Sequence, residues 1–336
     1  MLDKPDFPDE KIIACLQADF GLGIVQLAFL PLGNDLSTAV YRAVADDDTS
    51  YFCKLKRGVF DETSVALPKL LSEQGIAQII PPLATNIGQL RAALDAFNLI
   101  VYPFVTGTNG YDVELTNDQW TDFGAALKRI HTTILPRALA QNSEKESYDP
   151  YWREQCKHFM AHLDSEPFDD PVLIDLAEFL RSKRDMVRDL LGRAEQLADA
   201  MTARSLECVV CHTDLHPGNL FIDTTGALFI VDWDYPALAP KERDLIFIGG
   251  GQGFIGRTAH EEEQRFYQGY GPGQIDPIAL AYYRYERNIM DIAVACEQIL
   301  SSKQGGQDRA QTLGYLKWYF LPDCAIEIAL KMHFGS

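Results

Sequence analysis

The chain has 336 residues, of which 47% are hydrophobic and 23% charged, and its formal net charge is −18. These proportions are ordinary for a globular protein and exclude a fibrous repeat or a chain that is disordered throughout. The negative charge argues against a nucleic acid or an anionic membrane as partner, because phosphate groups would be repelled. It favours cationic ligands, either metal ions or a substrate with amines, although the same charge could serve solubility alone.

The length exceeds what one hydrophobic core usually serves, so two lobes or domains are expected. The 7 cysteines are scattered, and no stretch reaches ~18 uninterrupted apolar residues, so neither a disulfide framework nor a membrane span is predicted. The first residues are polar and acidic and lack the basic and apolar segments of a signal peptide. These features predict a cytoplasmic protein, either a monomer or a homodimer.

The N-terminal part alternates between strand and turn patterns. A helix is predicted over residues 9–19, and a second over residues 61–74, which ends at Gly75 and is expected to kink or break at Pro68. An aspartate-rich turn at residues 46–48 indicates a hairpin. Strands are predicted at residues 39–44, 51–56, 79–83 and 97–103. This part is therefore expected to be strand-rich, with one main internal helix.

The remainder has mainly helical patterns. Thr116 as N-cap and Gln119 at the third helical position form a capping box and predict a helix over residues 117–132. Further helices are predicted at residues 151–163, 171–202, 259–269, 278–300 and 311–320, with a surface loop at residues 304–307. The expected fold is α+β and bilobal, with a strand-rich lobe of residues 1–102 and a mainly helical lobe of residues 103–336.

One segment, residues 212–219, carries several chemically active side chains. It follows an apolar, strand-like run at residues 208–211 and precedes a hairpin made of residues 220–223 and 228–231. If the hairpin closes near Thr225, Asn219 lies across from Val231 at the open end of the ribbon.

This geometry places Asn219 and Asp232 at one end of the hairpin, with Asp214 a short loop away. An amide oxygen and carboxylates gathered in this way suit a hard cation such as Mg²⁺. A further carboxylate beside the metal suits acceptance of a hydroxyl proton. The spacing from Asp214 to Asn219 and the following Asp232 and Asp234 also match the catalytic loop and metal motif of protein kinases.

Two other interpretations explain less of this segment. Residues 208–212 match a haem-attachment pattern, but that chemistry normally needs export, and the cysteines fall in an apolar run. His212, Asp214 and His216 could form a transition-metal cluster, which would leave the rest of the segment without a role. His212 is instead expected to support the loop through hydrogen bonds.

A phosphoryl transferase also needs a cation on the nucleotide phosphates. Lys54 is the candidate, and Glu62 on the following helix is its expected ion-pair partner. Lys56 is the rival, because it points to the same face of the strand by period-two alternation.

Two further segments are candidates for contacts with the nucleotide. Residues 32–38 form the loop expected over the phosphates, with donors from Asn34, Ser37 and Thr38. Tyr102 and Phe104 lie in the expected inter-lobe hinge, whose backbone would bind the adenine edge; an apolar strand that ends at a proline is the simpler alternative.

Together these residues resemble the aminoglycoside phosphotransferase and choline kinase group, which has the protein-kinase-like fold. The spacing of Trp120, Gly124, Leu127 and His131 resembles the first large-lobe helix of that group. A closer similarity, to the spectinomycin phosphotransferase branch, runs through residues 50–56, 232–245, 247–251 and 282–287. The resemblance covers nearly the whole chain, from about residue 10 to residue 330.

The resemblance implies a role for each matching residue. Asp214 would be the catalytic base or orienting carboxylate, and Asn219 and Asp232 would hold Mg²⁺ with support from Asp234. Lys54 would contact the α- and β-phosphates of ATP, and Glu62 would fix Lys54. Arg243 and Asp244 would brace the catalytic loop. The N-terminal lobe would bind the nucleotide, and helices at about residues 137–204 would cap the substrate pocket or form a simple structural bundle.

Spectinomycin carries two methylamino groups, so a pocket for such a cationic aminocyclitol should offer carboxylates. The candidates for this contact are Glu242, Glu286 and Asp291, together with Tyr283 for packing on the rings. Asp291 could equally pair with Arg287, four positions earlier on the predicted helix. Rival functions are a kinase of the same fold that acts on choline, homoserine or a sugar-like metabolite, an inactive nucleotide-binding protein, and a protein kinase, although the chain lacks the A-P-E segment.

Overall fold

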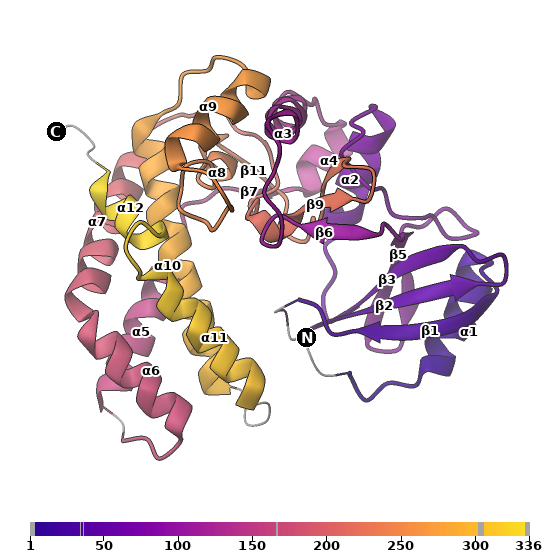
Figure 1. Cartoon of the computed structure of the whole chain (residues 1–336), viewed down its shortest axis with the longest axis horizontal. Helices are drawn as coiled ribbons and strands as arrows, with labels where there is room; N and C mark the ends of the chain where they lie inside the picture. The colour runs from indigo at the N-terminus through magenta and orange to yellow at the C-terminus, as the bar shows by residue number, and fades with distance from the viewer. Residues whose placement is uncertain (1–3, 34, 36, 166, 302–305, 333–336) are drawn as a thin grey trace.

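The computed structural model describes residues 4–33, 35, 37–165, 167–301 and 306–332. Figure 1 shows a sheet near the N-terminus beside a larger assembly of helices, with the C-terminus on the far side of that assembly. The elements of the N-terminal part are α1 (Asp9–Phe20), β1 (Ile24–Leu30), β2 (Thr38–Ala45), β3 (Ser50–Arg57), α2 (Thr63–Glu73), β4 (Ala92–Leu94) and β5 (Phe97–Pro103).

The N-terminal sheet has the strand order β1-β2-β3-β5-β4, and every neighbouring pair is antiparallel. Tyr41 of β2 and Cys53 and Leu55 of β3 are fully buried in the apolar cluster that includes side chains of α1. Because side chains alternate along a strand, Lys54 and Lys56 point to the opposite face. The apolar period of β3 therefore presents both lysines on one face, away from α1.

One local prediction for this part is wrong, and a second is wrong in part. Residues 79–83 form no strand; Ile79 makes an isolated bridge with Ile230 and is buried in the larger core, which accounts for the apolar pattern. The helix α2 continues through Pro68 without the predicted break, and a kink there stays a prediction.

The predicted hairpin is confirmed as β9 (Leu220–Asp223) and β10 (Leu228–Ile230), which join β6 (Gly107–Asn109) in the order β10-β9-β6. The Asp223 carboxylate fixes the turn by accepting from the amides of Thr225 and Ala227 at 2.8 and 2.9 Å. Glycine is needed at Gly107, because a Cβ there would lie 2.1 Å from the Ile222 carbonyl oxygen. A third sheet has the order β7-β11-β8 and consists of β7 (Glu144–Lys145), β11 (Ala237–Ala239) and β8 (Val209–Cys211).

The helices α3 and α9 interlock through glycines. A Cβ on Gly124 would lie 2.1 Å from the Phe266 carbonyl oxygen, and one on Gly269 would lie 1.8 Å from that of Thr121. The predicted capping box at the start of α3 is confirmed. The helical elements of this part are α3 (Asn117–His131), α4 (Arg137–Asn142), α5 (Tyr151–Ser165), α6 (Pro171–Ser182), α7 (Arg184–Thr202), η1 (Pro217–Asn219), α8 (Glu242–Leu245), α9 (Ala259–Tyr270), α10 (Pro277–Ser301), α11 (Gly306–Tyr319) and α12 (Ala325–Lys331).

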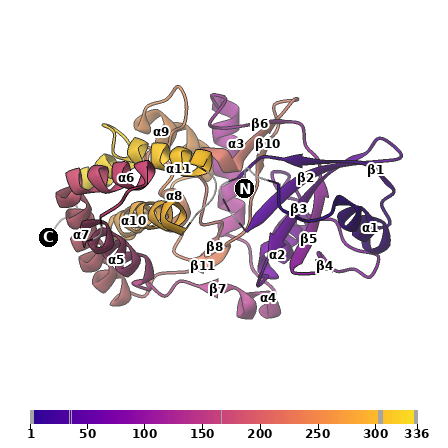
Figure 2. The same ribbon diagram turned by 90° about the horizontal axis from the view of Figure 1, so that it is seen from below.

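The central helix α10 packs against α5, α7 and α11, as Figures 1 and 2 show from two sides. The helix predicted over residues 171–202 is two helices, because the chain leaves helical geometry at Lys183 (φ −104°, ψ 7°). Of the predicted loop at residues 304–307, the first two positions lie outside the described residues and the last two begin α11. No helix in the described ranges is both long and apolar enough to cross a membrane. The predicted α+β class, with a strand-rich N-terminal sheet and a helical C-terminal part, is confirmed.

Candidate active site

The loop between β8 and η1 is organised around the His212 ring. Its Nε2 donates to the Val231 carbonyl oxygen at 2.9 Å, and its Nδ1 accepts from the Asp214 amide at 3.3 Å. The ring also packs edge-on against Trp233, with centroids 4.5 Å apart. The predicted supporting role of His212 is therefore confirmed, and a ring that is already bonded at both nitrogens is a poor metal ligand.

Asp244 braces the same loop from α8. Its carboxylate accepts from the amides of His212 and Thr213 at 2.9 and 2.6 Å and contacts His131 Nε2 at 3.0 Å. Thr213 has φ 76°, which is strained for a β-branched residue and persists only where neighbours fix it. The bracing implied for Asp244 is thus formed, whereas Arg243 pairs with Glu146 at 2.9 Å.

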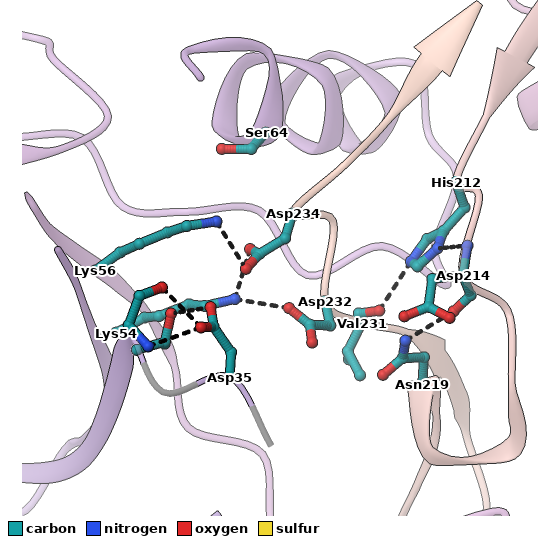
Figure 3. Close-up of polar contacts among 12 residues, drawn as sticks. Asp35, Lys54, Lys56, Ser64, His212, Asp214, Asn219, Val231, Asp232 and Asp234 are labelled. Carbon is teal, nitrogen blue, oxygen red and sulfur yellow. Dashed lines mark hydrogen bonds and ion pairs between the residues drawn. The ribbon is translucent and has the colours of Figure 1, made fainter. Parts of the chain in front are cut away.

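Asn219 and Asp214 are tied together, as Figure 3 shows. The Asn219 side-chain nitrogen donates to the Asp214 backbone carbonyl at 2.7 Å, which leaves the amide oxygen on the opposite side of the group. The Val231 amide donates to the Asn219 carbonyl at 3.0 Å, so the predicted alignment across the hairpin is confirmed.

The two aspartates that follow the hairpin meet the lysines of β3 (Figure 3). The Lys54 ammonium lies 2.6 Å from both Asp232 Oδ1 and Asp234 Oδ1, and Lys56 lies 3.0 Å from Asp234 Oδ2. Asp232 has φ 65°, an uncommon conformation for a residue other than glycine. Both predicted lysine candidates therefore reach this cluster, and Lys54 is the one that contacts both aspartates.

In this cluster, the charged forms of Lys54 and Asp232 stabilise each other. Burial alone would lower the pKa of Lys54, but the Asp232 and Asp234 carboxylates outweigh burial and hold that pKa above its ordinary value. The surrounding protein would by itself raise the pKa of Asp232, whereas the Lys54 ammonium lowers it, and the lowering prevails. Lys54 and Asp232 are therefore both charged at neutral pH.

Asp214 has two further cationic or polar neighbours, of which the sequence did not indicate Arg287. Arg287 of α10 contacts Asp214 Oδ1, and His216 Nε2 lies 3.7 Å from Asp214 Oδ2. Burial would raise the pKa of Asp214, but Arg287 and His216 hold it well below its usual range. Helical periodicity on α10 predicts that Arg287 can pair with Asp291, four positions later. It cannot predict the contact of Arg287 with Asp214, because these two residues are 73 positions apart.

The structure differs from the predicted Lys54–Glu62 ion pair. The Glu62 carboxylate instead accepts from Arg91 Nε at 2.7 Å, and its side chain is 62% exposed. Lys54 is drawn across to the hairpin aspartates, where two carboxylates provide a stronger field than one exposed glutamate.

The predicted phosphate loop is only partly described. Asn34 lies outside the described residues. The hydroxyls of Ser37 and Thr38 both donate to the Asp35 carboxylate at 2.7 Å, so a ligand would have to replace these bonds. In the hinge, the Phe104 amide donates to the Ser50 carbonyl at 3.1 Å, and Tyr102, one residue before the end of β5, lies near Lys54.

The predicted substrate carboxylates all have protein partners. Glu242 accepts from the Asp276 amide at 3.0 Å and is 3% exposed, so it helps to hold the start of α10. Glu286 pairs with Arg153 of α5, and Asp291 pairs with Arg287 at 2.9 Å, which confirms the alternative given for Asp291. Tyr283 is buried, with 5% of its surface exposed, which favours a core position.

The oxygen atoms beside the hairpin fit a divalent cation. The ligand set would be the Asn219 amide oxygen with carboxylate oxygens of Asp232 and Asp234, all hard donors that suit Mg²⁺. In the structure the Lys54 ammonium bridges the two aspartates and shows that they accommodate a positive charge between them.

Comparison with known proteins agrees with this assembly. Residues 28–278 match the family described as the phosphotransferase enzyme family. A crystal structure of spectinomycin phosphotransferase APH(9)-Ia in complex with ADP and spectinomycin is 35% identical in sequence. The alignment covers 98% of this chain and 99% of that one, with a TM-score of 0.89. No curated protein sequence matches the chain at a significant level.

More distant structures show the same fold. Amicoumacin kinase hAmiN, in complex with AMP-PNP, Ca²⁺ and its ligand Ami, is 16% identical over 93% of each chain, with a TM-score of 0.62. A choline/ethanolamine kinase family protein from Mesorhizobium loti is 14% identical over 96% of this chain and 99% of that one, with a TM-score of 0.54. Since the family match spans most of the sequence, the chain belongs to the phosphotransferase enzyme family and is an ATP-dependent small-molecule phosphotransferase.

Proposed function

We propose that the protein transfers the γ-phosphate of ATP to a hydroxyl of an aminoglycoside-type antibiotic, with spectinomycin as the first candidate, and so confers resistance in the cytoplasm. The observation that carries the substrate is the 35% identity, over 98% of this chain, to an enzyme crystallised with ADP and spectinomycin. Because fold alone does not fix a substrate, the site residues must support the chemistry independently.

Asp214 is the proposed catalytic carboxylate. Its depressed pKa keeps it ionised at neutral pH, so it can accept a hydrogen bond from the acceptor hydroxyl and orient that group toward the phosphorus. The hydroxyl proton passes to Asp214 as the new oxygen–phosphorus bond forms and the bond to the β-phosphate oxygen breaks. A weak base suffices, because phosphoryl transfer through a loose transition state depends mainly on positioning and charge.

Asn219 and Asp232 are the proposed ligands of Mg²⁺, with Asp234 in support. When bound there, Mg²⁺ would neutralise charge on the phosphates of ATP. Lys54 would exchange its aspartate contacts for the α- and β-phosphates, a role supported by the position of its ammonium between the two carboxylates. Nucleotide binding is assigned to residues 1–102, with Ser37, Thr38 and the hinge at Tyr102 as further contacts, and catalysis to residues 103–336.

On the substrate side, Asp291 is the predicted carboxylate with the closest link to catalysis, because Arg287 contacts both Asp291 and Asp214. The formal charge of −18 favours an amine-bearing acceptor in general terms. Helices at about residues 137–204 are the proposed cap, of which α5 and α7 pack directly on α10.

The test is ATP consumption by the purified protein with Mg²⁺ in the presence of spectinomycin, streptomycin, kanamycin, choline or homoserine. Spectinomycin-dependent turnover that disappears in Asp214→Asn is the expected result. Turnover with choline, homoserine or another acceptor, but not with spectinomycin, would support the kinase activity and reject spectinomycin as the substrate.

A further inference from the structure

Arg287 occupies a special place in the described part of the molecule, because it joins the catalytic loop to the central helix. It lies on α10, its side chain is 12% exposed, and its guanidinium contacts Asp214 Oδ1 on one side. On another side, Nε lies 2.9 Å from Asp291 Oδ1, one turn along the same helix. The buried Phe247 ring lies under the guanidinium, 5.3 Å from its central carbon. The Arg287 guanidinium therefore lies between the carboxylates of Asp214 and Asp291 and packs on the Phe247 ring.

This arrangement restricts the guanidinium more than a single ion pair would. A planar guanidinium can bind carboxylates along its edges while its face packs on an aromatic ring, whereas a lysine ammonium offers only a point charge. Asp291 and Phe247 thus fix the plane of Arg287 before any ligand binds. Removal of Arg287 would leave the Asp214 and Asp291 carboxylates without the cation that lies between them.

The second oxygen of Asp214 is held less tightly. His216 Nε2 approaches Asp214 Oδ2 at 3.7 Å, which is longer than a hydrogen bond. The His216 ring is itself fixed, because its Nδ1 accepts from the Gly218 amide at 3.0 Å and its face stacks on Tyr111 at 5.6 Å. Arg287 therefore holds Oδ1, whereas Oδ2 keeps capacity to accept a further hydrogen bond.

We propose that Arg287 is a positioning residue for phosphoryl transfer: it fixes the rotation of the Asp214 carboxylate so that Oδ2 faces the acceptor hydroxyl. Asp291 and Phe247 act through Arg287 by fixing its guanidinium. Arg287 keeps its own proton throughout and does not contact the reacting atoms. The inference rests on the catalytic role proposed above for Asp214, but it does not depend on which acceptor is used.

The test is steady-state kinetics of Arg287→Gln, Arg287→Lys and Asp291→Asn with the acceptor that the wild type phosphorylates. If the wild type phosphorylates none of the acceptors tested, the rate of ATP hydrolysis is measured instead. Because small misplacements of a catalytic group are costly, kcat should fall about 10²-fold in Arg287→Gln. Arg287→Lys should retain an intermediate rate and Asp291→Asn should lose less than Arg287→Gln. The KM for ATP should stay within about 2-fold of the wild type, because Lys54 is untouched.

A control separates positioning from loss of structure. Arg309→Gln removes an arginine that bridges the Asp170 carboxylate and the Ile299 carbonyl, away from the loop, so it should lower Tm and leave kcat unchanged. Guanidinium chloride at millimolar concentration should restore part of the kcat of Arg287→Ala. In the Asp214→Asn background, Arg287→Gln should cause no further loss in a radiolabelled transfer assay, because both changes act on one group.

Two results would overturn the role of Arg287: a kcat for Arg287→Gln within about 3-fold of the wild type, or an equal loss in the presence and absence of Asp214. If the enzyme did not phosphorylate spectinomycin but did phosphorylate another acceptor, only the proposed substrate would be rejected.

Discussion

Two clusters of opposite charges flank the catalytic hairpin, and they differ in how they are built. The first joins Lys54 and Lys56 of the N-terminal sheet to Asp232 and Asp234, so it spans elements that are about 180 positions apart. The second joins Asp214 to Arg287 and Asp291 within the helical part. Flexible ammonium groups occupy the site where a nucleotide and a cation are expected, whereas a rigid guanidinium holds the site where the acceptor is expected.

The difference follows from the chemistry of the two cations. A lysine ammonium on a flexible stem can exchange one anionic partner for another, as a phosphate-binding group must. An arginine guanidinium that pairs with two carboxylates and packs on an aromatic ring loses less conformational entropy for each hydrogen bond that it forms, and it keeps one geometry. The comparison suggests that the first cluster rearranges when the nucleotide binds and that the second one persists.

The largest effect is expected at Asp214. Asp214→Asn removes the proton acceptor and the charge that orients the hydroxyl, so kcat should fall about 10³-fold while ATP binding is retained. Coupled ATP-consumption assays and a fluorescent-nucleotide titration would measure these two quantities. Retention of more than about a tenth of the wild-type kcat would remove Asp214 from the proposed role.

Lys54→Ala tests the first cluster. Loss of a preorganised cation from the phosphates should lower kcat/KM for ATP about 10²-fold. Lys56→Ala is the matched control from the same strand face, and it should change kcat/KM several-fold at most, because Lys56 pairs with Asp234 whereas Lys54 pairs with both Asp232 and Asp234. If Lys56→Ala had the greater effect, the assignment of the two lysines would be reversed.

Glu262 is a buried carboxylate that forms no ion pair with the described residues, so its pH dependence should contrast with that of the two clusters. Burial raises the pKa of Glu262 from 4.5 to about 7, and its carboxylate accepts from the Gly249 amide at 2.9 Å. Between pH 4.5 and about 7 the unfolded chain releases this proton and the folded chain keeps it, so the free energy of unfolding should fall as pH rises through that window.

Glu262→Gln should therefore flatten this part of the stability profile by about 1–3 kcal/mol, measured by urea unfolding at several pH values. A profile that is unchanged by the substitution would show that Glu262 ionises alike in the folded and unfolded chains.

The smallest effect is expected at Glu62. Because Glu62 is exposed and pairs with Arg91, Glu62→Gln should change kcat/KM for ATP by less than about 2-fold and the free energy of unfolding by less than about 1 kcal/mol. A loss comparable to that of Lys54→Ala would indicate that Glu62 turns to Lys54 in the nucleotide-bound enzyme.

Local patterns predicted much of the fold and the centre of the site. The capping box joins Thr116 to Gln119, three positions later, and the alignment of Asn219 with Val231 and the supporting hydrogen bonds of His212 form within the single segment of residues 212–231. The apolar run at residues 79–83 gave the wrong element, since burial in a core and pairing in a sheet favour the same side chains.

The sequence by itself determined the order of most helices and strands, the hairpin with its carboxylates, and the presence of lysines on one face of β3, because these follow from short-range periodicity and turn chemistry. Only the tertiary structure decided the partners of the charged residues: Lys54 with Asp232 and Asp234, Glu62 with Arg91, and Arg287 with Asp214. The physical reason is that a charged side chain pairs with whichever opposite charge packing brings within a few ångströms, and that proximity is set by elements far apart in the chain.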